Sequence, residues 1–459
     1  MRGSALPSIL AGGGVLTAEP DRVLTPARSA DFADPLVPTE WWRAAVGADR
    51  ATPPGPGKPI TVIDSGLDLT HPEFAHRPNT TALNAQSTVG SEDEGHGTAV
   101  SSVIGAPVDG VGLVGIYPQA VLQSWDASSS LGEGASLSQE IAGLSAAARH
   151  GRGVINVSLG SEERSAVEEE AILSAFGAGS LVVASAGNAF QSGNQPQYPA
   201  DYPHVLTVAA TNQQNRPSSF SSSSLAVDLS APGEDIPVAL PLAINSTGYD
   251  VWAGTSFSAP MVSGAAAWVW TVRPTLEKTQ LFDLMRVSAH DIWTTGYDKD
   301  TGFGILDVPS ALAASPPSVD PQEPNDDVFI VRPRGLFVQG TTPLTAPGRR
   351  RAALKARLDV TEDPEDVYRV FVPAHKRVRV TMKPTQNAQL EVWGPATRTV
   401  GERGTARKRD LMGASTRTST APESVVVANK TARSRIVYAD VFLAPNIVQA
   451  SYVLTVAPA

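Results

Sequence analysis

Ser256 is the residue of this chain whose setting best suits nucleophilic chemistry. It follows a Gly-Thr pair and precedes a run of small residues, Ala265 to Val272, which predicts a closely packed helix. Pro260 is tolerated only near a helix start, where backbone N–H groups still lack partners, so Ser256 should lie at the N-terminus of that helix. The helix dipole and the unpaired N–H groups there favour negative charge, such as an oxyanion. An ordinary capping serine in an Ala-rich helix explains this stretch alone equally well.

Three upstream stretches place an acid, a histidine and an amide in similar glycine-rich settings. Asp64 precedes Ser-Gly, His96 stands between two glycines, and Asn188 follows Ser-Ala-Gly. Together with Ser256 they give the chain order Asp, His, Ser, and the chain has no G-x-S-x-G motif. In these four motifs and their order, the sequence resembles the subtilases, the subtilisin-like serine proteases, over roughly residues 34–314.

The resemblance implies a role for each side chain in peptide hydrolysis. Ser256 would attack the scissile carbonyl, His96 would take its proton and pass it to the leaving amine, and Asp64 would hold the imidazole in the required tautomer. Asn188 and the Ser256 backbone N–H would donate to the oxyanion. The implied activity is that of a serine endopeptidase, a hydrolase, that requires no cofactor.

The resemblance also implies where an extended polypeptide substrate adds as a strand through its main chain. One wall of the primary specificity pocket would be Ser158-Leu159-Gly160, and the other Ser185-Ala186-Gly187. Gly134-Ala135-Ser136 would lie across the substrate from the first wall. Gln197 would form the pocket floor, where an amide suits polar or medium-sized side chains better than large aromatic ones.

The elements that must position these groups follow from the apolar runs. Ile60–Ile63, Val154–Ser158 and Leu181–Ala184 are typical of buried parallel strands covered by helices, and helical patterns at Leu137–His150 and Ser165–Ala178 fall between strands. This alternation predicts an α/β fold with a doubly wound, mostly parallel sheet. Functional groups of such sheets gather beyond the carboxyl ends of the strands, and the acid and the amide both stand at such ends.

The composition of the chain changes near residue 315. Residues 315–327 have linker composition, and beyond them alternating runs predict a smaller antiparallel β-sandwich over residues 328–459. These runs are Tyr368–Val372, Arg377–Met382, Gln389–Trp393, Ser424–Val427, Arg435–Phe442 and Tyr452–Val456. The stretch Glu323-Pro324-Asn325-Asp326 and residues 363–371 resemble bacterial pre-peptidase C-terminal domains. Residues 394–423, with basic side chains among Gly, Ser and Thr, are interpreted as a mobile loop, with anion binding as an alternative.

Residues 1–33 precede the predicted catalytic domain of residues 34–314. Gly14–Val23 is similar to the end of a subtilase inhibitory prodomain, so we interpret residues 1–33 as a prodomain remnant and linker. A signal peptide is the alternative, which three consecutive glycines and a proline weaken. We expect maturation to cut the chain between about Val23 and Asp34, where it is polar and turn-rich.

Composition restricts the class of protein further. The 459 residues include no cysteine, so disulfides and thiolate metal sites are excluded, and no run of about 20 apolar residues spans a membrane. The net charge of -10 divides into -17 for residues 1–314 and +7 for residues 315–459. The two parts could attract each other, or they are simply solvated surfaces of different composition. The basic residues lack interleaved aromatic residues, which argues against nucleic-acid binding.

The resemblance further implies polypeptide substrates, a secreted enzyme and a monomer. Structural calcium is common in subtilases, but Ala106–Gly112 lacks the Asn-rich calcium loop of the best-known members. Asp298, Asp300 and Thr301 offer too few oxygens for an EF-hand loop, so a polar turn without metal is expected there. Two rival hypotheses stay open: a catalytically silent subtilase scaffold that binds partners through the sandwich, and a dedicated processing protease with one cognate substrate. The presence of all four catalytic residue types argues against the first.

Overall fold

The structure is a computed structural model that describes residues 34–86, 92–129 and 134–459. The predicted prodomain remnant of residues 1–33 lies outside the described residues. The predicted sandwich falls within them entirely, and the predicted catalytic region does so except for residues 87–91 and 130–133. No helix in the described part of the chain is both long and apolar enough to cross a membrane.

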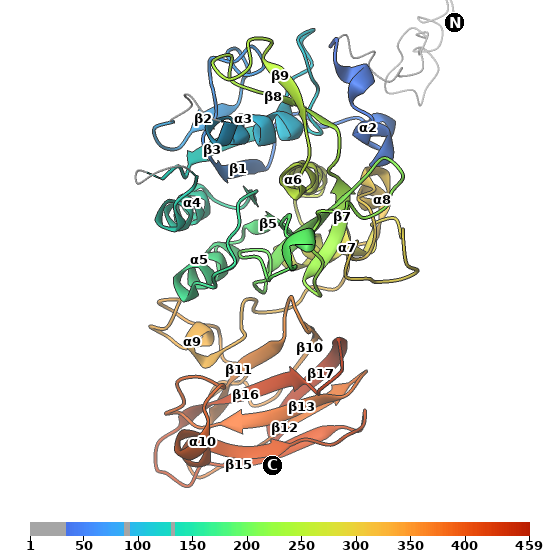
Figure 1. Cartoon of the computed structure of the whole chain (residues 1–459). Coiled ribbons are helices and arrows are strands. Elements are labelled where there is room, and N and C mark those ends of the chain that lie inside the picture. Colours follow the sequence, from blue (N-terminus) through green and yellow to red (C-terminus); the bar gives the residue numbers. More distant parts are fainter. Residues whose placement is uncertain (1–33, 87–91, 130–133) are drawn as a thin grey trace, which may run out of the picture. The chain divides into compact units, whose positions relative to one another are not determined.

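A seven-stranded parallel sheet forms the centre of the catalytic region (Figure 1). Its strands lie in the order β2 (Thr80–Ala82), β3 (Val121–Asp126), β1 (Pro59–Asp64), β4 (Val154–Val157), β5 (Leu181–Ser185), β6 (Val205–Thr211) and β7 (Val227–Pro232). The strands from β4 to β7 are buried at every position. Helices cover both faces of the sheet, which is why the apolar runs of these strands do not alternate.

Four helices cover the two faces of this sheet. They are α3 (Glu92–Gly105) and α6 (Thr255–Val272) on one face, and α4 (Leu137–His150) and α5 (Ala166–Gly177) on the other (Figure 1). Alternate residues of β1 belong to different cores, since Ile60 and Val62 pack with α3 and α6 whereas Ile63 packs with α4 and α5. The predicted doubly wound α/β fold is therefore confirmed.

Shorter elements surround the sheet. They are the turns η1 (Val37–Thr39), η2 (Ala48–Arg50) and η3 (Phe190–Ser192), the helices α2 (Trp42–Ala45), α7 (Lys278–Val287) and α8 (Val308–Ala313), and the hairpin of β8 (Ile236–Ala239) and β9 (Tyr249–Trp252).

Two four-stranded antiparallel sheets share one apolar core in the C-terminal region. The first has the order β10 (Ala352–Asp359), β17 (Gln449–Pro458), β12 (Arg377–Pro384) and β15 (Glu423–Ala428). The second has the order β11 (Glu365–Val372), β16 (Arg435–Leu443), β13 (Ala388–Trp393) and β14 (Leu411–Ser415), with the short helices α9 (Val328–Val331) and α10 (Gly404–Asp410) beside the strands. Val380 of β12 and Val392 of β13 meet in this core, so the predicted antiparallel β domain is confirmed.

Two segments differ from their sequence-based interpretation. Residues 394–423 contain α10 and β14 rather than a mobile loop, and Arg407 of α10 pairs with Glu391 of β13. Within the connecting segment of residues 315–327, Asp320, Glu323 and Asn325 are buried. Composition indicated a linker for the second segment and a mobile loop for the first, because it does not show which polar side chains find partners after folding.

Candidate active site

Asp64 and His96 form a hydrogen-bonded pair at the carboxyl end of β1. Asp64 Oδ1 and His96 Nδ1 lie 2.8 Å apart, and the side chains are 1% and 23% exposed, respectively. The Ser65 backbone N–H also donates to Asp64 Oδ1 at 2.8 Å, which fixes the carboxylate. The buried acid therefore holds one ring nitrogen of a histidine that is partly open to solvent. This geometry directs the other nitrogen, Nε2, away from Asp64.

Gly97 sets the close approach of α3 to β1. A Cβ at Gly97 would lie 2.2 Å from the Gly66 carbonyl oxygen and 3.1 Å from Asp64 Cβ. The Gly97 backbone N–H donates to the Ser65 hydroxyl at 3.0 Å. The glycine after His96 is thus a packing requirement of the acid–histidine pair.

Ser256 is the second residue of α6, as the sequence predicted. Pro260 has no N–H to donate to the Ser256 carbonyl oxygen, which instead accepts the Ser158 hydroxyl at 3.0 Å. The Ser256 hydroxyl lies 3.3 Å from the Ser158 carbonyl oxygen. The next residue, Phe257, places its ring 5.8 Å from that of His96, centroid to centroid. The first turn of α6 therefore lies beside the acid–histidine pair.

Asn188 follows β5 and is oriented by Thr255, the residue before Ser256. The side-chain oxygen of Asn188 accepts from the backbone N–H and from the hydroxyl of Thr255, each at 3.0 Å. The Thr255 hydroxyl oxygen in turn accepts the Gly187 N–H at 3.1 Å. The exposed amide therefore turns its NH2 group away from Thr255. Sequence reasoning missed Thr255, for which the only signal was its place beside Ser256.

The two predicted walls of the specificity pocket meet at Gln197. A Cβ at Gly187 would lie 2.6 Å from Gln197 Cγ, and a Cβ at Gly160 would lie 3.6 Å from Gln197 Oε1. Gln197 itself is half-buried, and Gly160 is exposed. Of the other wall residues, Ser158, Ser185 and Ala186 are buried and Leu159 is half-buried. The structure thus brings the predicted floor residue into contact range of both walls.

The third predicted substrate segment, residues 134–136, is linked to the strand end that bears Asp64. The Ser136 backbone N–H donates to the Ala127 carbonyl at 2.8 Å, and the Ala127 N–H donates to the Asp64 carbonyl at 2.6 Å. Ala135 pairs with Ser128 in an antiparallel bridge, and Gly134 and Ala135 are exposed. These residues therefore lie between the carboxyl end of β1 and the start of α4.

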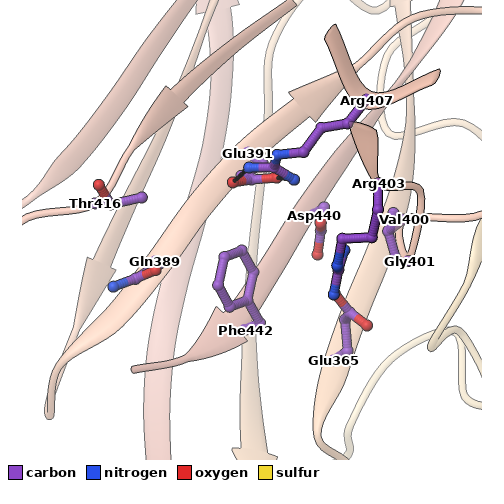
Figure 2. Close-up of a pocket in the computed structure, with 10 residues that line it drawn as sticks. All are labelled: Glu365, Gln389, Glu391, Val400, Gly401, Arg403, Arg407, Thr416, Asp440 and Phe442. Atoms are coloured by element: carbon purple, nitrogen blue, oxygen red, sulfur yellow. Dashed lines mark hydrogen bonds and ion pairs between the residues drawn. The ribbon is translucent and has the colours of Figure 1, made fainter. Parts of the chain in front are cut away.

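Three pockets in the described residues lie away from Asp64 and His96, and one of them, of about 160 Å³, is lined by Asp283, Arg286 and Arg357 among others. Another, of about 250 Å³, adjoins the second wall and is lined by Ala186, Tyr198 and neighbouring residues. The third, of about 470 Å³, belongs to the sandwich (Figure 2) and is lined by Glu365, Gln389, Glu391, Val400, Gly401, Arg403, Arg407, Thr416, Asp440 and Phe442. Arg407 lies over Glu391 there and pairs with both of its carboxylate oxygens.

Clusters of acidic residues that can hold a metal ion occur in the described residues, but they do not include Asp298 or Asp300, which the sequence analysis considered. The Asp298 carboxylate accepts the N–H groups of Asp300 and Thr301 and the Thr301 hydroxyl, and so closes a polar turn as expected. Elsewhere one carboxylate oxygen from each of four residues lies within 4.8 Å of the others; this carboxylate cluster comprises Asp320, Glu323, Asp363 and Asp366. A second group comprises His204, Glu323 and Asp326. The sequence did not reveal them because their members lie far apart along the chain.

These features define an α/β protein in which a buried acid pairs with a partly exposed histidine, beside a serine in the first turn of a helix. The sequence pattern of the subtilase family matches residues 55–304. The chain therefore belongs to the subtilase family, whose members are serine endopeptidases that act on polypeptides.

Bacterial subtilisins are among the similar proteins. Subtilisin amylosacchariticus from Bacillus subtilis subsp. amylosacchariticus is 33% identical over 254 residues, which cover 55% of this chain and 65% of that relative's length. Subtilisin BL from Lederbergia lenta is 34% identical over 257 residues, 56% of this chain and 91% of the relative.

One solved structure is similar over most of the described chain. Fervidolysin from Fervidobacterium pennivorans, a keratinolytic enzyme related to subtilisin, matches with a TM-score of 0.57 and 22% identity, over 87% of this chain and 71% of its own. At this identity the likeness concerns the fold alone.

Proposed function

We propose that this protein is a serine endopeptidase with Ser256 as nucleophile, His96 as general base and Asp64 as the acid that orients the base. The observation that carries the proposal is the 2.8 Å bond between Asp64 Oδ1 and His96 Nδ1, beside the helix turn that holds Ser256. All three residues fall within the segment that matches the subtilase family.

The chemistry follows from the orientation of the imidazole. With Nδ1–H donated to Asp64, neutral His96 presents Nε2 as an acceptor for the Ser256 proton while the serine oxygen attacks the scissile carbonyl. The same nitrogen then returns the proton to the leaving amine. The Asn188 NH2 group and the Ser256 backbone N–H donate to the oxyanion, and the carboxamide oxygen of Asn188 stays bound to Thr255.

An extended peptide is the proposed substrate. Its specificity side chain would lie between Ser158–Gly160 and Ser185–Gly187, above the Gln197 amide, which suits polar or medium-sized groups. Contact-range positions of Gln197 relative to Gly160 and Gly187 support this arrangement. We further propose that the enzyme is secreted, and that its sandwich is of the bacterial pre-peptidase C-terminal kind.

Replacement of the nucleophile tests the assignment. Ser256→Ala should abolish peptide hydrolysis and leave the circular dichroism spectrum unchanged, because only one hydroxyl is lost. A serine-directed phosphonate should label Ser256 in the parent protein, as located by peptide mass spectrometry. Undiminished turnover in the variant, or labelling of another serine, would exclude this mechanism.

A further inference from the structure

The carboxylate cluster lies where the connecting segment meets the sandwich. Asp320 and Glu323 come from residues 315–327, Asp363 from the turn before β11, and Asp366 from β11 itself. All four residues are buried, and the most exposed of them, Glu323, is 9% exposed. Four carboxylates packed together away from water repel one another strongly when ionised. Burial and the neighbouring Asp366 accordingly raise the pKa of Asp320.

Asp363 is the clearest sign that the cluster serves a ligand. It is 1% exposed, yet neither of its carboxylate oxygens has a hydrogen-bond partner. Asp320 Oδ1 and Glu323 Oε2 are buried without hydrogen-bond partners as well, and His204 Nε2 lies 3.9 Å from Glu323 Oε2. Buried charges in proteins are paired or coordinate metals, because leaving them unpaired is costly. The cluster therefore contains several buried carboxylate oxygens that lack a hydrogen-bond donor and could bind a cation.

The neighbouring cationic side chains are engaged elsewhere. Arg357 Nε lies 3.2 Å from Asp320 Oδ2, but the guanidinium also pairs with Asp283 and Glu362. Lys278 Nζ donates to the backbone carbonyl of Glu323, at 2.9 Å, and not to its carboxylate. These cations thus contact the edge of the cluster and leave the Asp363 oxygens unpaired.

Neutral donors hold the carboxylates in place. Asp366 accepts the hydroxyls of Tyr368 and Tyr452 at 2.9 and 2.5 Å, one on each oxygen. Asn325 donates to Glu323 Oε1 at 2.5 Å and accepts the Val367 N–H at 2.8 Å. Partners of this kind orient the ligands of a metal without neutralising them. A set of four carboxylates suits Ca²⁺, since Mg²⁺ sites usually have one or two carboxylates and keep several waters.

The partners of His204 adjoin this cluster. His204 belongs to the catalytic region, is fully buried, and places its ring nitrogens 3.0 Å from Asp326 Oδ2 and 3.4 Å from Glu362 Oε1. Its backbone has a φ of 61°, a costly conformation for a non-glycine residue, so its contacts must compensate. Asp326 lies three residues after Glu323, and Glu362 directly precedes Asp363. Whatever fixes the cluster therefore also fixes both acids that hold His204.

We propose that the carboxylate cluster binds one Ca²⁺ ion, and that this ion fixes the connecting segment in the position in which it locks the catalytic domain onto the sandwich through His204. The ion replaces mutual repulsion by attraction among the four carboxylates. It thereby places Asp326 and Glu362 on either side of the histidine. The expected consequence is that the two domains unfold together when Ca²⁺ is bound and separately when it is removed.

Terbium luminescence tests the binding step. Full-length Ser256→Ala protein, which cannot cleave itself, is stripped with EDTA and titrated with Tb³⁺. Tyrosine excitation should sensitise Tb³⁺, because two tyrosine hydroxyls bind a ligand of the ion, and Ca²⁺ should displace it. Asp363→Asn should weaken Ca²⁺ binding at this site by more than about tenfold. Asp298→Asn, in the self-closed polar turn, should leave it unchanged.

Three results would exclude or revise the proposed calcium site. The site is excluded if no sensitised Tb³⁺ is displaced by millimolar Ca²⁺, or if Asp363→Asn and Asp298→Asn behave alike. Equal displacement by Mg²⁺ would overturn the assignment to calcium. If circular dichroism shows that Asp363→Asn does not fold, Glu323→Gln replaces it, and the same losses are expected.

Differential scanning calorimetry of the same proteins tests the coupling step. With Ca²⁺ the Ser256→Ala protein should show one transition, and with EDTA two. Adding His204→Gln should preserve Tb³⁺ sensitisation but reduce the effect of Ca²⁺ on the unfolding of the catalytic region, since the ion is bound and the histidine contacts are lost, while the ion pairs of Arg286 with Asp359 and of Asp283 with Arg357 persist. Identical thermograms with Ca²⁺ and EDTA, or an undiminished effect of Ca²⁺ on the catalytic region in the His204→Gln protein, would refute the proposed coupling.

Discussion

Thr255 orients Asn188, the proposed oxyanion donor. It donates its hydroxyl and its backbone N–H to the same oxygen of Asn188 and accepts the Gly187 N–H. Asn188 follows β5 in the chain, and its side chain is fixed by Thr255, the first residue of α6. An oxyanion donor that is fixed before the reaction needs no reorganisation during it.

Replacing Asn188 should therefore affect turnover more than substrate binding. Loss of one such donor in a subtilisin costs about 10²–10³ in kcat, and we carry that magnitude over to Asn188→Ala. Thr255→Val, which only frees the amide, should cost less, and Thr255→Ser should retain most activity because it keeps the hydroxyl. Steady-state kinetics on a short peptide measure kcat and KM. An unchanged kcat in Asn188→Ala would show that Asn188 is not a donor.

Glu73 is a buried acid whose ionisation should limit stability at alkaline pH. Its Oε1 accepts the Leu113 N–H at 2.8 Å and the Tyr249 hydroxyl at 3.0 Å, and Oε2 is buried without a hydrogen-bond partner. Burial raises the pKa of Glu73 to about 8. Between about pH 4.5 and 8 the folded state therefore keeps a proton that the unfolded state has lost, so stability falls as pH rises through this range.

The variant Glu73→Gln should make this pH dependence shallower. Glutamine keeps the acceptor oxygen and cannot ionise, which removes a difference of at most roughly 5 kcal/mol between the two ends of the range. Denaturant unfolding of the Ser256→Ala protein from pH 5 to pH 8 measures the slope. Exposed Glu163→Gln is the control and should keep the parent slope. Equal slopes for both variants would contradict the assignment.

The proposed catalytic residues could be selected from the sequence because short motifs carry them. His96 stands beside Gly97, whose smallness has a packing reason, and Ser256 opens a helix with a recognisable composition; such local signals are readable without a structure. Thr255 and Glu73 act through partners brought near by folding, such as Asn188 and Tyr249. No local pattern marks such contacts, so sequence reasoning missed both.

Helix α6 joins the active site to the core through its small residues. It is buried at nearly every position from Phe257 to Trp270. A Cβ at Gly264 would lie 2.2 Å from Ile116 Cγ2. A larger residue at position 264 would push α6 away from the neighbouring core, and Ser256 would move with it. The Ala-rich composition is thus a condition of the close approach, as the sequence predicted.

The variant Gly264→Ala tests this packing. Alanine has the higher helix propensity by about 1 kcal/mol, so propensity alone predicts stabilisation. We expect destabilisation instead, because overpacking costs about 1–3 kcal/mol or more. Gly55→Ala is a suitable control, since its nearest neighbour is 3.7 Å from the added Cβ. Thermal unfolding compares the two; an increase in Tm for Gly264→Ala would show that the core accommodates the methyl group.

Element prediction succeeded for the long helical patterns and for most strands of the sandwich, and it missed several strands, including the inner strands β3 and β6 of the parallel sheet. The pattern of Leu137–His150 matched α4 residue for residue, since its apolar stripe repeats over almost four turns. Strands β10 and β14 were missed, and each is an edge strand, but so are β11 and β15, which were predicted. The burial of β10 and β14 alternates less regularly than that of β15, so their sequences give a weaker strand signal.

At the scale of the whole chain, buried ion pairs join the catalytic region to the sandwich. Arg286 is 4% exposed and lies 3.2 Å from Asp228 of its own region and 2.8 Å from Asp359 of β10. Asp283, also buried, pairs with Arg357 of the same strand. The Asp283–Arg357 pair agrees with the opposite net charges of the two parts, whereas the Arg286–Asp359 pair has the reverse sense. Their residue identities were not predictable, because each pair spans more than 70 positions.

Removal of residues 315–459 should therefore lower the thermal stability of the catalytic region strongly and the rate of hydrolysis of short peptides little. The proposed catalytic groups all precede residue 315, so a short peptide should still be cleaved at low temperature. Asp283 and His204 would lose their partners, and breaking a buried pair costs about 3–5 kcal/mol. For a domain of this size that lowers Tm by on the order of 10 °C. Calorimetry of Ser256→Ala chains and peptide assays of active ones measure the two effects.

A chain that ends at residue 327 is the control, because it keeps Asp326 but lacks Arg357. It should regain little of the lost thermal stability. An unchanged Tm in either truncated chain would show that the interface ion pairs contribute nothing to stability.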